Sequence, residues 1–317
     1  MTELAMGAKE VSRFSVKARI WWKAVRPFSF PLSAMPALMG AAFAWVKGYD
    51  FSLSLAILTL LGAVTVHAAA NLLQDYFDYT GGIDKPGTLG GSGLLVAGIL
   101  GPRAVFMGSI ACFAIAALIA APLIMHAGAA LLWIVLAGFA LGAGYAVPRL
   151  GLKYRAFGDV AVFLAFGAGI TMGSCLIQSR TPDLSALACG IPFGFLVVAV
   201  LVANNMRDVK DDERARVGTL AVIMGERATR AFYMALVIAA YAFPIICVQM
   251  NMLNAGALFV LATLASMRNL LLFVWRAPEG DRDAMAIAVE RTAKLALAWG
   301  IAMTAGMVGW RLITAGA

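Results

Sequence analysis

Charged side chains are scarce in this chain. Only 13% of its 317 residues are charged and 62% are hydrophobic, whereas an average soluble domain has roughly 25% charged residues. Too few polar side chains are available to cover a water-soluble globule of this length. The composition therefore excludes an ordinary soluble protein and predicts an integral membrane protein.

Cysteine and histidine are also rare, with four and two residues respectively. The four cysteines lie in apolar segments, without CxxC spacing: Cys112, Cys175, Cys189 and Cys247. Disulfide frameworks and zinc sites need closely spaced pairs or clusters of such residues. We therefore expect buried, unpaired thiols and neither kind of site.

Long apolar runs, by contrast, fill most of the chain. A run of about 20 apolar residues can cross a bilayer as a helix. The runs have the approximate bounds 29–47, 51–74, 104–125, 127–147, 158–178, 184–205, 230–250, 253–275 and 289–313. These runs predict an all-α polytopic membrane protein with nine transmembrane helices in a single domain, residues 29–317, after a basic cytoplasmic segment, residues 1–28.

The positive charges are distributed unevenly over the predicted loops. With the N-terminus in the cytoplasm, 21 of the 25 Lys and Arg residues fall on the cytoplasmic side. Cytoplasmic loops of membrane proteins characteristically collect these residues. We therefore expect a protein of the cell's inner (plasma) membrane with a cytoplasmic N-terminus. The net charge of +8 then reflects topology, and no nucleic-acid partner is expected; the oligomeric state is not indicated.

Seven of the 17 acidic residues are concentrated in two short stretches, after the second and the sixth apolar run. Both stretches have the pattern N-x3-D-x2-D, beginning at Asn71 and Asn204, and all three positions are offset by 133 residues. The equal offset predicts an internal pseudo-repeat of about four helices. Because both stretches follow an even-numbered helix, they face the same compartment, the cytoplasm.

Helical geometry places the polar residues of each stretch on one face. At 100° per residue, an amide and two carboxylates share an arc of ~60° on each helix. These residues are Asn71, Asp75 and Asp78 on the first helix, and Asn205, Asp208 and Asp212 on the second.

Carboxylates crowded beside a low-dielectric region repel one another unless a cation lies between them. Hard oxygen ligands suit Mg²⁺, which completes its coordination with water and substrate phosphate. A diphosphate site at one end of an apolar helical bundle predicts a substrate with a charged head group and a long apolar tail, such as polyprenyl diphosphate. Two alternatives remain: solvated loop acids that balance nearby cations, and an ion-coupled transporter. Transporters, however, place their sites near the bilayer midplane.

Several motifs resemble the UbiA superfamily of intramembrane aromatic prenyltransferases, which carry two aspartate-rich motifs on helices 2 and 6 of a nine-helix fold. The segments that carry the resemblance are RPFSFP, NLLQDYFDYTGGID, KYRAFGDVAVF, NNMRDVKDD, TLAVIMG and TAKLALAWG. They are most similar to the menaquinone branch, the MenA-like 1,4-dihydroxy-2-naphthoate polyprenyltransferases. The resemblance implies Mg-dependent transfer of a polyprenyl group to that aromatic acid, with loss of the ring carboxylate as CO₂. The alternative acceptor is 4-hydroxybenzoate.

The resemblance also implies two Mg²⁺ ions, held by the two acidic motifs. The expected ligands are Asp75 and Asp78, together with Asp84, for one ion, and Asp208 and Asp212 for the other. Asn71 and Asn205 are expected as supporting ligands or as residues that orient the carboxylates.

Residues outside the two motifs are expected to bind the substrates. Lys153 and Arg155 would bind the departing diphosphate, together with Lys85 in the loop after the second helix. Tyr145 and Tyr154 would present π faces to the allylic cation.

The aromatic acceptor is expected to meet Arg26 and His67, and Asp84 or Asp159 would assist proton removal. The sequence departs from the family at Gln74, where many relatives have Asn. It also has no Arg between Lys85 and Arg103, whereas some relatives carry one there. Either Lys85 or Arg103 takes over the phosphate contact of that Arg, or the acceptor or the donor differs.

Overall fold

The computed structural model describes residues 15–147, 151–152 and 157–315. Within these residues, nine helical segments are long and apolar enough to cross a membrane. The first five are Pro27–Lys47 (η1, Pro27–Ser29, and α2, Pro31–Lys47), Leu53–Thr80 (α3), Pro102–Ala127 (α4), Ala129–Ala146 (α5) and Gly158–Ser179 (α6, Gly158–Val162; η2, Phe163–Gly169; α7, Ile170–Ser179). The other four are Leu184–Ala215 (η3, Leu184–Ala186, and α8, Leu187–Ala215), Glu226–Gln249 (α10), Ala255–Arg276 (η4, Ala255–Thr263, and α11, Leu264–Arg276) and Arg282–Ala315 (α12). The predicted all-α class and order of spans are confirmed.

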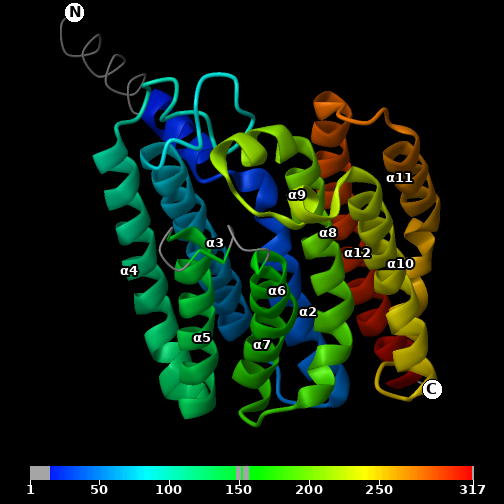
Figure 1. Cartoon of the computed structure of the whole chain (residues 1–317). Coiled ribbons are helices and arrows are strands. Elements are labelled where there is room, and N and C mark those ends of the chain that lie inside the picture. Colours follow the sequence, from blue (N-terminus) through cyan, green and yellow to red (C-terminus); the bar gives the residue numbers. More distant parts are fainter. Residues whose placement is uncertain (1–14, 148–150, 153–156, 316–317) are drawn as a thin grey trace, which may run out of the picture.

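The segments alternate in direction, so their connections gather at two ends of the bundle (Figure 1). Residues 15–24, the connection 81–101, the short helix α9 (Leu220–Met224) and the α11–α12 connection lie at the upper end in this view. The C-terminus of α12 lies at the lower end. The two acidic stretches, near the ends of α3 and α8, therefore share the upper end.

Three helices extend well beyond the predicted apolar runs, and one of them, α12, begins at Arg282 although its run begins near residue 289. α3 continues to Thr80 and α8 to Ala215, whereas the apolar runs end near residues 74 and 205. Hydropathy reports which residues tolerate lipid, but a helix continues into polar surroundings until its backbone is interrupted. In α8 the interruption is Arg216, whose left-handed conformation (φ 56°) ends the helix. Both acidic motifs are consequently held on helical backbone.

The packed structure also begins before the predicted boundary at residue 28. Residues 15–24 are helical, and Ile20, Trp21 and Ala24 pack with α3, α4 and the connection between them. Their spacing forms an apolar stripe on one face of a helix. This part of the N-terminal segment therefore covers the upper end of the bundle.

The interior of the bundle is built around α8, which packs against α2, α10 and α12. On the other side α8 meets the π-helix η2, where backbones approach closely: a Cβ on Gly167 would lie 2.8 Å from the Cα of Gly194. Small residues permit such close approach of membrane helices. The four cysteines are unpaired; Cys175, Cys189 and Cys247 are buried as predicted, whereas Cys112 is only half-buried.

Candidate active site

A cavity of about 440 Å³ lies among α2, α3, α5, the α6–η2 segment and α8. This volume is within the usual range for small-molecule sites. We call it the main cavity. Carboxylates and amides from both acidic motifs contribute to its lining, together with apolar residues such as Leu32, Phe166, Val197 and Val200. The structure thus brings the two motifs, 133 residues apart in the sequence, to one space.

The first motif contributes Asn71, Asp78 and, from the following turn, Asp84. The backbone N–H groups of Ile83 and Asp84 both donate to the Asp78 carbonyl, at 2.8 and 3.0 Å. These bonds fold the chain back after α3 and bring Asp84 to the wall of the main cavity. The Asn71 side-chain nitrogen donates to the carbonyl of Val25 at 3.0 Å.

Asp75, by contrast, is absent from the lining of the main cavity. Its Oδ1 pairs with Arg26 Nη2 at 2.8 Å, and its Oδ2 accepts from the Ser92 backbone N–H at 2.9 Å. Helix periodicity predicted a shared face with Asn71 and Asp78, but these two partners turn the carboxylate toward the N-terminal segment and the 81–101 connection. The role of Asp75 as a metal ligand stays a prediction.

Gly91 fills the narrow space between two carboxylates. Its φ is 62°, and a Cβ there would lie 2.8 Å from Asp84 Oδ2 and 3.0 Å from Asp75 Oδ1. A residue with a side chain would be strained in this left-handed conformation and would displace both acids. Gly91 and Ser92 were not among the predicted site residues; the adjacent glycines Gly90 and Gly91 are a turn signal that could have pointed to them.

Arg26 connects the N-terminal segment to α3. Besides Asp75, its Nη2 donates to the Asn71 carbonyl at 2.9 Å and to Gln74 Oε1 at 3.3 Å. Gln74, which departs from the family pattern, therefore contacts Arg26. Among the described lining residues the cations are Arg26 and Arg207, and Lys85 is exposed and not part of the lining.

The second motif contributes its predicted residues, Asn205, Asp208 and Asp212, and also Asp211. Asp208 accepts two bonds from the adjacent Arg207, with Arg207 Nε at 2.8 Å. Asp212 accepts from the Thr219 hydroxyl at 3.3 Å. These contacts fix the carboxylates on the last turns of α8.

Asp211 links α8 to the start of α12. Arg282 Nη2 lies 2.6 Å from Asp211 Oδ2, and the exposed Arg214 lies 3.6 Å from its Oδ1. Asp211 was not among the predicted site residues because it lies off the arc shared by Asn205, Asp208 and Asp212. Its partner Arg282 is 71 residues away, which no local pattern indicates.

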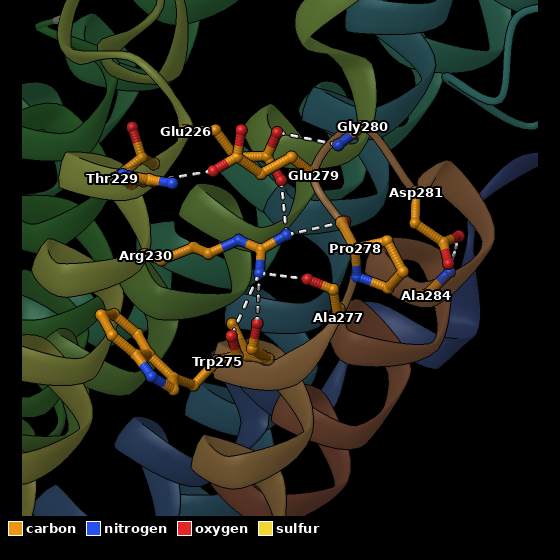
Figure 2. Close-up of polar contacts among 12 residues, drawn as sticks. Glu226, Thr229, Arg230, Trp275, Ala277, Pro278, Glu279, Gly280, Asp281 and Ala284 are labelled. Atoms are coloured by element: carbon orange, nitrogen blue, oxygen red, sulfur yellow. Dashed lines mark hydrogen bonds and ion pairs between the residues drawn. The ribbon is translucent and has the colours of Figure 1, made fainter.

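The α11–α12 connection that precedes Arg282 is held by Arg230 of α10 (Figure 2). This buried guanidinium donates to backbone carbonyls at the end of α11 and in the connection, and it pairs with Glu226. The accepting carbonyls belong to Val274, Trp275, Ala277 and Pro278. Glu226 also accepts from the Gly280 N–H at 2.8 Å. The network secures the backbone from which Arg282 reaches Asp211.

His67 and Tyr145 line the main cavity. His67 is buried, with Nδ1 3.1 Å from Ser33 Oγ and Nε2 3.3 Å from Ser29 Oγ. Its ring meets Phe166 edge-on at 5.0 Å between centroids. Both ring nitrogens thus have hydroxyl partners, and the imidazole forms part of the wall.

Three predicted site residues lie outside the described residues: Lys153, Tyr154 and Arg155. Their roles stay predictions.

The donor set of the main cavity fits Mg²⁺. The lining offers oxygens from Asp78, Asp84, Asp208 and Asp212 and from the amides of Asn71 and Asn205. Within the described ranges, no three His, Cys, Asp or Glu side chains converge on one point. Mg²⁺ is characteristically bound by one or two carboxylates, with water and phosphate as its other ligands. Carboxylates that do not converge on one point therefore suit Mg²⁺ ions whose remaining ligands would come from water and a diphosphate.

The fold and the site define an integral membrane protein with an acid-lined, partly apolar cavity near one end of its helical bundle. The sequence pattern of the UbiA prenyltransferase family matches residues 33–299. The chain belongs to this family, and it is a prenyl-transferring enzyme of the membrane. The predicted family and enzyme class are confirmed, and the transporter alternative loses its support.

Relatives and a solved structure agree with this assignment. The chain is 30% identical over 313 residues to the 1,4-dihydroxy-2-naphthoate octaprenyltransferase of Escherichia coli, covering 92% of this chain and 94% of the relative. It is 34% identical over 224 residues to the enzyme of the same name from Mycobacterium tuberculosis, covering 68% and 73%. A UbiA homolog from Archaeoglobus fulgidus bound to GPP and Mg²⁺ has a similar fold, with a TM-score of 0.61, 16% identity and coverage of 90% and 99%.

Proposed function

We propose that the protein transfers a polyprenyl group from polyprenyl diphosphate to 1,4-dihydroxy-2-naphthoate, the aromatic acid of menaquinone biosynthesis. The naphthoate octaprenyltransferases among its relatives support this acceptor. The observation that carries the proposal is the main cavity, in which two acidic motifs and apolar side chains share one space. A diphosphate head and a prenyl tail need these two environments side by side.

The oxygens of both motifs would hold two Mg²⁺ ions, one beside Asn71, Asp78 and Asp84 and the other beside Asn205 and Asp212 with Asp208. Bound Mg²⁺ supplies positive charge that neutralises the departing diphosphate. Asp208 is already paired with Arg207, so this part of the lining carries both an anion and a cation at the diphosphate site. Lys153 and Arg155, for which the sequence predicts a role in diphosphate binding, would bind the same diphosphate.

The apolar part of the cavity would receive the first isoprene units. Phe166, Val197 and Val200 line it without offering a nucleophile, which protects an allylic cation from capture. Tyr145 in the same lining supplies a π face, which stabilises nearby positive charge. Tyr154 is proposed for the same role.

Arg26 and His67 would form part of the wall around the aromatic acceptor. Arg26 lines the cavity with a charge that suits the naphthoate carboxylate, although its Nη2 is shared with Asp75. Both ring nitrogens of His67 lie within hydrogen-bond distance of serine hydroxyls. His67 would therefore shape the wall of the acceptor site and would not transfer a proton.

The charge asymmetry of the loops supports a cytoplasmic site. The upper end in Figure 1 carries the cation-rich connections, and such connections face the cytoplasm. We therefore place the N-terminus and the main cavity at the cytoplasmic face of the plasma membrane, where a soluble aromatic acid and Mg²⁺ are available.

An acceptor competition tests the proposal. Purified protein in nanodiscs receives Mg²⁺, a labelled polyprenyl diphosphate and equal amounts of 1,4-dihydroxy-2-naphthoate and 4-hydroxybenzoate, and the products are separated by mass. We expect prenylated naphthoate, which has lost its ring carboxylate as CO₂, to dominate. Dominant prenylated hydroxybenzoate would replace the proposed acceptor, and the absence of both products would contradict transfer to an aromatic acid.

A further inference from the structure

A second, smaller cavity lies beside the main cavity and shares part of its wall. It has a volume of about 10 Å³ and is lined by Tyr145, Gly158, Asp159, Leu201, Asn205 and Thr219. Tyr145, Leu201 and Asn205 line both cavities. We call this smaller space the side cavity.

Asp159 is the charged residue of the side cavity. It lies in the first turn of α6 and is 7% exposed. Its Oδ1 is buried and has no hydrogen-bond partner in the described structure. Burial of an unpartnered carboxylate oxygen is costly, and native proteins leave few such atoms unsatisfied. Oδ1 therefore needs a donor that fits the side cavity.

One water molecule fits both the space and the chemistry. The volume is about the smallest that admits a water, and a buried water typically has two to four polar partners. Thr219 donates its hydroxyl hydrogen to Asp212, so its lone pairs remain free to accept. Asn205 offers an amide NH₂ group, and Asp159 offers a carboxylate oxygen. A water at this point would accept from Asn205 and donate to Thr219 and Asp159.

Asn71 in the first motif is already oriented in a comparable way. Its side-chain nitrogen donates to the Val25 carbonyl at 3.0 Å and to the Ser29 hydroxyl at 3.2 Å. With the NH₂ group occupied, the amide oxygen is the atom left to bind a cation. Hydrogen bonds from behind a ligand orient it and raise metal affinity.

We propose that the side cavity holds an ordered water and that Asp159, through this water, is a positioning residue for the second acidic motif. The water holds the NH₂ group of Asn205, which turns the amide oxygen toward the main cavity. It also anchors Thr219, which holds the Asp212 carboxylate. The inference rests on the proposed function, because it assigns the oxygens of Asn205 and Asp212 to Mg²⁺ binding.

Two substitutions at Asp159 separate geometry from charge. Asp159→Asn keeps an oxygen that accepts from the water, whereas Asp159→Leu has nearly the same shape and accepts nothing. Because Asp159→Leu removes a buried charge that no cation of the described residues pairs, it should be at least as thermally stable as the wild type without Mg²⁺. Each variant is titrated with Mg²⁺ in the presence of inorganic diphosphate, and the rise in Tm is measured. The Mg²⁺ concentration that gives half of the full rise is then compared between variants. The rate of prenyl transfer is measured over the same Mg²⁺ concentrations.

Asp183→Leu is the matched control, because Asp183 lies in the connection at the opposite end of the bundle and accepts from Tyr49 and Ser185. This variant should be less stable without Mg²⁺ but keep the wild-type Mg²⁺ requirement. We expect Asp159→Asn within about threefold of the wild type and Asp159→Leu to need roughly tenfold more Mg²⁺.

A wild-type Mg²⁺ requirement in Asp159→Leu would overturn the inference. So would an equal defect in Asp159→Asn, because that result would assign the effect to charge. Wild-type protein that shows no Mg²⁺-dependent stabilisation with diphosphate would overturn the inference and the proposed metal site together. Wild-type protein that shows it, but forms no prenylated product, would overturn the proposed function alone.

Discussion

The ion pair between Arg26 and Asp75 holds the N-terminal segment to α3, and its removal should destabilise the protein strongly. The side chains of Arg26 and Asp75 are only 14% and 4% exposed, with 2.8 Å between Nη2 and Oδ1. Removing one partner of such a pair leaves a buried charge and costs about 3–5 kcal/mol. The Ser92 N–H still donates to Asp75, so we expect about 3 kcal/mol for Arg26→Gln, at the lower end of that range.

The assay is thermal unfolding in one detergent at one scan rate. A loss of about 3 kcal/mol corresponds to a decrease in Tm of roughly 4–5 °C for a chain of this size. Arg227→Gln is the control: its ion pair with Glu279 has the same 2.8 Å separation, but the side chains are 89% and 60% exposed. Exposed pairs contribute about 0–1 kcal/mol, so Tm should change by no more than about 2 °C.

A double variant isolates the pair. Arg26→Gln with Asp75→Asn replaces two charges by two amides, and it should be more stable than Arg26→Gln alone because no buried charge remains. The reasoning is refuted if Arg26→Gln lowers Tm no more than Arg227→Gln, or if the double variant is the less stable one.

Three further outcomes follow from the site and its surroundings. Asp78→Asn and Asp208→Asn should each lower the rate of prenyl transfer at least about 100-fold, the order of magnitude for a lost electrostatic contact to the transition state. The circular dichroism spectrum should remain unchanged. Near wild-type turnover in either variant would contradict the metal assignment. Gly91→Val should reduce turnover and add about 1–2 kcal/mol of backbone strain, measured as a lower Tm than that of the wild type. Burial alone would raise the pKa of Asp183, but hydrogen bonds from Ser185 and Tyr49 together with the charge of Lys47 hold the pKa below its ordinary value. The stability that Asp183 contributes is therefore present above the pKa of the unfolded state, and it is lost as pH falls through the lower pKa of the folded state. The Tm difference between wild type and Asp183→Asn should consequently shrink as pH falls below about 4.

The transmembrane fold could be predicted because lipid contact demands long apolar runs, and those runs are visible in the sequence. The ends of α3 and α8 could not, because Thr80 and Ala215 lie where polar residues are tolerated and hydropathy no longer distinguishes helix from loop. The π-helix Phe163–Gly169 was also missed, since its wider turn depends on packing against α8.

The candidate site was predictable to the level of helix faces. Helical spacing grouped Asn205, Asp208 and Asp212 on one face, and all three lie in the lining of the main cavity. It did not foresee that Asp75 turns to Arg26, because a face is too coarse to fix a side-chain direction and the partner lies in another segment. The bond between Asp211 and Arg282 was invisible for the same reason: it depends on which helices become neighbours.

The central claim is that the acid-lined cavity transfers a prenyl group to 1,4-dihydroxy-2-naphthoate with Mg²⁺. It is tested most directly by measuring prenylated naphthoate and released diphosphate together, with purified wild-type protein, with and without Mg²⁺, and with Asp208→Asn as the inactive control. The account predicts equal amounts of both products from the wild type with Mg²⁺, and neither without Mg²⁺ or from Asp208→Asn. Prenylated naphthoate formed at the wild-type rate without Mg²⁺, or no naphthoate product under any condition, would contradict it.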